Sequence, residues 1–136
     1  MNAKAFFVVG TLALTLMESG ISILSVSADT VDTSWSNKYT VCSMCDHTPA
    51  CQKSSRSAYY NYTNYVSSSM KYINIHAALY DGRDVSGHRG YKSYTGSTTH
   101  LWNNAIESTG NGISVRIDRI RKANGTASGV WNPDVK

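Results

Sequence analysis

The densest group of reactive side chains consists of three cysteines and one histidine. Cys42, Cys45, His47 and Cys51 lie within the ten residues CSMCDHTPAC. Thiolates and an imidazole can together bind a tetrahedral zinc ion, whereas cysteines in an oxidising compartment form disulfides. Structural zinc sites usually take two pairs of ligands from distant parts of the sequence, but His47 lies on a tight loop between Cys45 and Cys51. The spacing therefore favours a disulfide, with the zinc site as the alternative.

The number of cysteines is odd, which limits what a disulfide can do. Cys42, Cys45 and Cys51 allow three different single disulfides, and the sequence leaves the pairing open. Each pairing leaves one thiol over. We expect this thiol to be able to join a second copy of the chain in a covalent dimer.

The other histidines do not belong to a recognised catalytic motif. The residues whose chemistry suits acid–base catalysis or anion binding are His76, His88, His100, Glu107, Arg83 and Arg89. No GxSxG, HExxH, P-loop or paired-carboxylate signature connects them. An enzyme would need one of these histidines to meet a carboxylate in a single cleft. We therefore expect a protein without enzymatic activity and without a cofactor.

Tyrosines indicate a second kind of site, one for binding. The chain has nine tyrosines, and the tyrosine ring offers an apolar face with a polar tip that can stack on a sugar or lie at a membrane interface. The candidate binding surface consists of Tyr60, Tyr62, Tyr72 and His76. The alternative is that the tyrosines fill a leucine-poor core and form cross-strand pairs.

An alternating pattern locates the element that would position two of these residues. Ile73, Ile75, Ala77 and Leu79 alternate with Tyr72, Asn74, His76 and Tyr80. A period of two over eight residues predicts a half-buried strand, with His76 on its polar face. A long loop containing Asp81-Gly82 and residues 87–90 is expected to follow.

The C-terminal part shows the same alternation. Residues 113–118 and 126–131 read as two strands, and Asn124-Gly125 between them is a strong hairpin signal. Arg119 and Arg121 share the parity of the apolar residues Ile113, Val115 and Ile117. The strand is therefore expected either to leave the core after Ile117 or to contain a bulge that resets its register.

Together these patterns predict an all-β fold, a small antiparallel β-sandwich or barrel of about 5–7 strands. The sandwich is assigned to residues 57–136. Residues 29–56 are expected to form a polar arm that carries the cysteine cluster and one short strand from Trp35 to Val41.

Residues 1–28 read as a secretory signal peptide that forms a helix and is then removed. Lys4 precedes an uncharged apolar run, and Val26-Ser27-Ala28 supplies a small-residue cleavage site before Asp29. Glu18 interrupts the apolar region, whereas a membrane span needs roughly 20 apolar residues. Cleavage between Ala28 and Asp29 and secretion are therefore favoured over an uncleaved anchor.

The net charge of +4 points to anionic surroundings outside the cell. A modest basic excess suits the cell wall or membrane surface of bacteria as a partner. It falls short of the dense basic patch of a nucleic-acid-binding protein.

The layout resembles small exported proteins of Gram-positive bacteria, including uncharacterised secreted families and lactococcin-type bacteriocins. The shared features are the signal peptide, a Ser-, Asn-, Tyr- and Gly-rich chain, alternating strands and a late Gly129-Val130-Trp131. This resemblance implies a secreted β-sandwich and, for the bacteriocins, attack on the cell-wall synthesis of a neighbouring bacterium. The function we expect from the sequence is a bacteriocin-like or cell-envelope-directed extracellular effector. The alternative is a secreted glycan- or surface-binding module.

Overall fold

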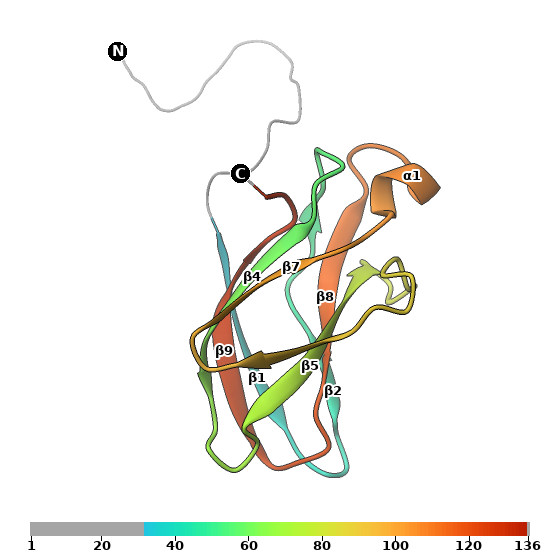
Figure 1. Cartoon of the computed structure of the whole chain (residues 1–136). Coiled ribbons are helices and arrows are strands. Elements are labelled where there is room, and N and C mark those ends of the chain that lie inside the picture. Colours follow the sequence, from blue (N-terminus) through green and yellow to red (C-terminus); the bar gives the residue numbers. More distant parts are fainter. Residues whose placement is uncertain (1–31, 136) are drawn as a thin grey trace, which may run out of the picture.

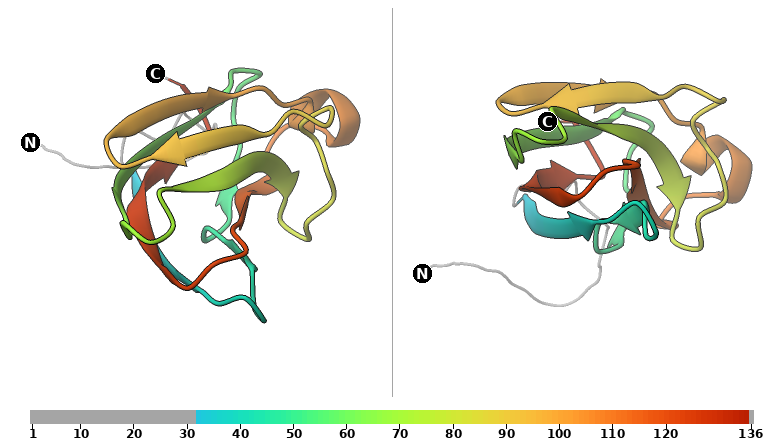
Figure 2. Two further views of the ribbon diagram at one scale, coloured as in Figure 1. Left: turned by 60° about the horizontal axis from the view of Figure 1, so that its bottom comes forward. Right: turned by 90° about the horizontal axis from the view of Figure 1, so that it is seen from below.

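The computed structural model describes residues 32–135. The predicted signal peptide, with its cleavage site at Ala28 and Asp29, lies outside this range. The described chain is mostly β and forms two antiparallel sheets that pack face to face, as Figures 1 and 2 show. This confirms the predicted all-β sandwich. No helix of residues 32–135 is long and apolar enough to cross a membrane.

Each sheet collects strands from distant parts of the chain. The four-stranded sheet has the order β1 (Thr33–Tyr39), β9 (Gly125–Asn132), β4 (Tyr59–Val66), β7 (Ser97–Leu101). The five-stranded sheet has the order β2 (Cys45–His47), β8 (Ser114–Ile120), β5 (Tyr72–Leu79), β6 (Tyr91–Tyr94), and β3 (Cys51–Gln52) also pairs with β8. A five-residue helix, α1 (Ala105–Thr109), follows β7. The prediction was about 5–7 strands. Residues 32–135 contain seven longer strands and, in addition, the two short strands β2 and β3.

Strand β5 follows the predicted alternation. Ile73, Ile75, Ala77 and Leu79 are buried between the sheets, whereas Tyr72, Asn74 and His76 lie on the outer face. Burying an aliphatic side chain contributes about 1.5–3 kcal/mol. The free energy of these inward residues therefore holds the outer residues of β5 in a fixed register.

The predicted C-terminal hairpin is wrong. Asn124-Gly125 does connect two strands, but β8 belongs to the five-stranded sheet and β9 lies between β1 and β4 in the other. The inner residues of β9, Ala127 and Trp131, are buried against the opposite layer. A turn signal predicts a change of direction, but it does not determine whether the next strand pairs in the same sheet.

Residues 33–52 are part of the sandwich rather than a separate arm. They supply β1 to one sheet and β2 and β3 to the other. The short strands escaped prediction because β2 and β3 have three and two residues, too few to show a period.

The Gly129-Val130-Trp131 segment has a packing role. A Cβ on Gly129 would lie 2.2 Å from the carbonyl oxygen of Tyr62 and 2.8 Å from Cζ2 of Trp35. The ring of Trp131 is buried and lies 5.8 Å from that of Tyr59. Glycine is therefore required where the indole of Trp35 crosses β9, and Trp131 fills the core beside it.

Candidate binding site on the five-stranded sheet

The cysteine cluster is spread along strand β8. Cys45 lies opposite Ile120 and Cys51 opposite Val115. Five residues of strand correspond to about 17 Å, whereas the Cα atoms of a disulfide lie within about 7 Å of one another. A Cys45–Cys51 disulfide is therefore excluded in this fold, and Cys42, in the turn before β2, lies beyond Cys45. All three cysteines are free thiols in the structure.

The same separation rules out the zinc site of Cys42, Cys45, His47 and Cys51. The Nδ1 atom of His47 instead lies 2.8 Å from the carbonyl oxygen of Thr48. Within residues 32–135 no group of three or more His, Cys, Asp or Glu side chains is arranged to hold a metal ion. Cys42 and Cys45 are both exposed, so the covalent dimer stays a prediction.

The predicted binding surface is divided between the two outer faces of the sandwich. Tyr60 and Tyr62 point outward from β4 in the four-stranded sheet, where the rings of Tyr60 and His100 lie 6.1 Å apart. Tyr72 and His76 point outward from β5 in the five-stranded sheet. Each pair therefore shares a strand and a face, but the two pairs lie on opposite sides of the sandwich.

Tyr72 lies in a group of aromatic and cationic side chains. Its ring is 5.8 Å from the ring of Tyr94, 4.7 Å from Lys92 Nζ and 4.1 Å from Arg121 Cζ. The guanidinium of Arg121 is fixed in place because its Nε and Nη2 donate to the carbonyl oxygen of Met70, at 3.1 and 2.7 Å. We call Tyr72, Tyr94, Lys92 and Arg121 the aromatic end of the face.

A second group lies further along the same face. His76, Asp118 and His47 are direct neighbours across β5, β8 and β2. His76 Nε2 lies 4.0 Å from Asp118 Oδ2, while Arg116 Nε donates to Asp118 Oδ1 at 2.6 Å. A pocket of about 290 Å³ covers this row. We call His76, Asp118, Arg116 and His47 the histidine end.

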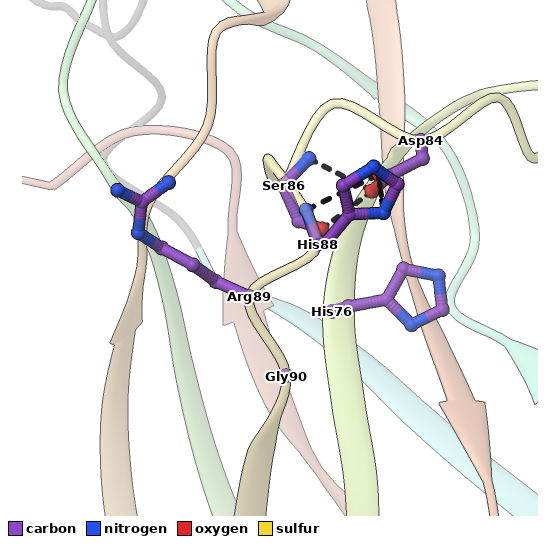
Figure 3. Close-up of a pocket in the computed structure, with 6 residues that line it drawn as sticks. All are labelled: His76, Asp84, Ser86, His88, Arg89 and Gly90. Carbon is purple, nitrogen blue, oxygen red and sulfur yellow. Dashed lines mark hydrogen bonds and ion pairs between the residues drawn. The ribbon is translucent and has the colours of Figure 1, made fainter.

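A loop between β5 and β6 extends the histidine end, as Figure 3 shows. The Asp84 carboxylate accepts hydrogen bonds from the Ser86 N–H, the Ser86 hydroxyl and the His88 N–H. These bonds, the Ser86 hydroxyl first, outweigh burial and hold the pKa of Asp84 below its usual value. His76, Asp84 and His88 all line a pocket of about 330 Å³.

The other side of this loop is anchored by an aromatic contact. The guanidinium of Arg89 lies 4.2 Å from the ring centroid of Trp102, and in Figure 3 it points away from the two histidines. Gly87 has a φ of +59°, and a Cβ there would lie 2.7 Å from Arg89 Nη1 and 2.9 Å from Trp102 Cζ3. The loop therefore requires glycine at this turn.

The two pockets, which share His76, bring together the histidines and carboxylates that an enzyme would need. His76 lies beside Asp118, and His88 Nδ1 is 3.5 Å from Asp84 Oδ2. The Ser86 hydroxyl donates to Asp84 and not to a histidine, so the serine of this loop forms no serine–histidine pair. The arrangement can donate and accept hydrogen bonds with a hydroxyl-rich ligand, and His88 is 96% exposed to meet one.

The other residues singled out from the sequence do not join this site. His100 lies on the four-stranded sheet, Glu107 is on α1, and Arg83 pairs with Asp81 at 2.8 Å. Sequence reasoning missed Asp118 and Arg116 as site residues. Their outward parity on β8 was visible, but only the pairing of β8 with β5 places them beside His76.

The fold and the site define a β-sandwich with a polar, aromatic outer face on its five-stranded sheet. A family model described as a protein of unknown function (DUF2712) matches residues 23–135, and the chain belongs to this family. No curated protein and no solved structure matches the chain. The resemblance to lactococcin-type bacteriocins stays a prediction.

Proposed function

We propose that this is a secreted, cell-envelope-directed protein that binds a glycan chain of a bacterial envelope along the outer face of the five-stranded sheet. One observation carries the proposal. Tyr72, Asn74 and His76 lie in a line on β5, with aromatic and cationic groups at one end and a histidine–carboxylate row at the other.

The spacing of this line suits an extended polymer. Outward residues of a strand repeat about every 6.6 Å, so Tyr72 and His76 are about 13 Å apart. The ring of Tyr72 offers an apolar face for a sugar. Asp118 and His76 can bond sugar hydroxyls, while Lys92 attracts a phosphate or carboxylate substituent.

The geometry supports binding rather than catalysis. Arg116 donates to both oxygens of Asp118, at 2.6 and 3.5 Å, and to the carbonyl oxygen of Tyr80 at 3.0 Å. The carboxylate thus already has a charged partner. A general base is instead expected to be free to take a proton from the reacting group.

Substitution on the two outer faces tests the proposal. Tyr72→Ala should lower the affinity for purified, anionic-polymer-bearing bacterial walls about tenfold, because aromatic stacking contributes about 0.5–1.5 kcal/mol and tenfold corresponds to 1.4 kcal/mol. Tyr62→Ala is the matched control, since Tyr62 is also half-buried but lies on the opposite face. Equal losses for both variants, or no loss for Tyr72→Ala, would contradict the proposal.

Two further measurements define the kind of protein. Growth inhibition of related bacteria by the wild-type protein, reduced by Tyr72→Ala, would identify a bacteriocin-like effector. Wall binding without inhibition would identify a surface-binding module. Release of soluble sugars from the walls, abolished by His76→Ala, would overturn the assignment of a binding protein and indicate an enzyme.

A further inference from the structure

Three turns are joined at one end of the sandwich. They are the β1–β2, β4–β5 and β8–β9 connections, at the bottom of Figure 1 and facing the viewer in the right panel of Figure 2. Val41 N–H donates to Asn124 Oδ1 at 3.3 Å, and Ser69 Oγ donates to the carbonyl oxygen of Asn124 at 3.0 Å. Arg121 N–H donates to the carbonyl oxygen of Met44 at 2.9 Å. These bonds make one continuous surface, which we call the turn end.

The turn end carries charge of one sign. The segments 38–45, 64–72 and 121–128 contain Lys38, Lys71, Arg121 and Lys122 and no Asp or Glu. The three lysines are exposed. Asp46 follows this region on β2 and Asp118 lies further along β8, whereas Asp81, Asp84, Glu107 and Asp134 belong to the β5–β6 loop, to α1 and to the segment after β9. The three turns themselves are therefore cationic.

Two apolar side chains project from the same surface. Val41 and Met44 flank the β1–β2 turn and are 55% and 42% exposed. The turn itself is closed by two backbone hydrogen bonds of 3.1 Å between Thr40 and Ser43. A rigid turn that presents apolar tips beside lysines has the composition of a surface that enters the boundary between lipid headgroups and acyl chains.

We propose that the turn end docks on a bilayer that contains anionic phospholipid. Lysines at such a surface are attracted by the negative headgroups within about one Debye length. Val41 and Met44 would enter the headgroup layer, and the strands would stand upright on it. The exposed apolar pair favours a lipid surface over a dissolved anionic polymer, which offers no apolar layer.

This inference goes beyond the proposed glycan binding and uses different residues. Arg121 contributes to both surfaces, because its guanidinium also lies over Tyr72. The test therefore leaves Arg121 unchanged and substitutes Lys71, Lys122, Val41 and Met44, which are all exposed.

Vesicle sedimentation of the full chain tests the proposal. Its two lipid mixtures are phosphatidylcholine alone and phosphatidylcholine with phosphatidylglycerol. We expect binding to the anionic vesicles to fall at least tenfold in K71E/K122E, several-fold in V41S/M44S, and steeply with added salt. R56E/R83E, with the same change in net charge away from the turn end, should bind like the wild type. The N-terminal segment is identical in all variants, so differences between them report on the turn end.

Three results would overturn the proposal. The first is equal losses in K71E/K122E and R56E/R83E, and the second is an equal effect of K71E/K122E on binding to both lipid mixtures. The third is binding to soluble polyphosphate, but not to vesicles, that depends on Lys71 and Lys122. Loss of wall binding in Tyr72→Ala with intact vesicle binding would leave both proposals standing. Intact wall binding in that variant would refute only the glycan site.

Discussion

Within residues 32–135 two cationic side chains, Lys53 and Arg119, are fully buried, and they are stabilised in different ways. Lys53 Nζ donates to the carbonyl oxygen of Pro133 at 2.6 Å and to Asp134 Oδ1 at 3.1 Å. The guanidinium of Arg119 lies 3.9 Å from the ring centroid of Trp35, and none of its nitrogens has a hydrogen-bond partner among the described residues. One charge is held by hydrogen bonds and the other by an aromatic face.

The hydrogen bonds that hold Lys53 belong to a larger network around Asp134, whereas Arg119 has no such network. Asp134 also accepts bonds from the N–H and hydroxyl groups of Ser54 and Ser55, so the end of the described chain is fastened to the segment before β4. Around Arg119, burial lowers the pKa of the guanidinium to about 10. It therefore stays charged at neutral pH without an acceptor, which makes it the costlier of the two charges.

The largest effect is expected from removing the partner of Lys53. Asp134→Ala leaves a buried ammonium without its carboxylate, and such a change typically costs about 3–5 kcal/mol. Urea unfolding should show this loss, and adding Lys53→Met should recover part of it because no unpaired charge then remains. A loss below about 1 kcal/mol for Asp134→Ala would show that the Lys53–Asp134 ion pair contributes little to the stability of the fold.

A smaller effect is expected in acid. Burial alone would raise the pKa of Asp134, but bonds from Ser55 and Ser54 and the charge of Lys53 hold it below its usual value. A lowered pKa in the folded state stabilises the protein above the ordinary carboxyl pKa of about 3.9, and this stabilisation is lost as the pH falls toward the folded value. The stability difference between wild type and Asp134→Asn, measured by urea unfolding, should therefore shrink below about pH 4. A constant difference down to pH 2 would refute the role of ionisation.

The smallest change in stability is expected at the other cation. Arg119→Met removes a buried charge that has no hydrogen-bond acceptor and keeps a long apolar side chain over Trp35, so the free energy of unfolding should be unchanged within about 1 kcal/mol or rise. Thermal unfolding would measure this. A loss comparable to that of Asp134→Ala would mean that the two buried cations are equally well partnered, which would remove the contrast between them.

Arg119 also shows how far the sequence could be read. The alternation that predicted β5 and its buried residues was reliable because apolar burial dominates the free energy there. The same parity pointed Arg119 inward, and we expected a bulge or an exit from the core. The strand instead continues to Ile120 with Arg119 buried, because the guanidinium packs on an indole from a strand some eighty residues earlier. Such a long-range partner leaves no local signal.

The candidate site was predictable to a similar extent. Tyr72 and His76 share a strand, so their common face followed from the period of two. Tyr60 and Tyr62 gave the same local signal, but their strand was assigned to the opposite sheet by pairing with β9. Asp118 reached His76 through the pairing of β5 and β8. The sequence predicted which residues of a strand share a face, but it did not predict which strands lie beside it.

The position of β9 has a consequence for synthesis. In the four-stranded sheet β1 pairs with β9 alone, and β9 follows every other described strand in the chain. A nascent chain therefore cannot complete this sheet until residues 125–134 have left the ribosome, however long the earlier strands have been available. For a chain whose N-terminus reads as an export signal, this delay would keep the polypeptide open during passage through a translocation channel.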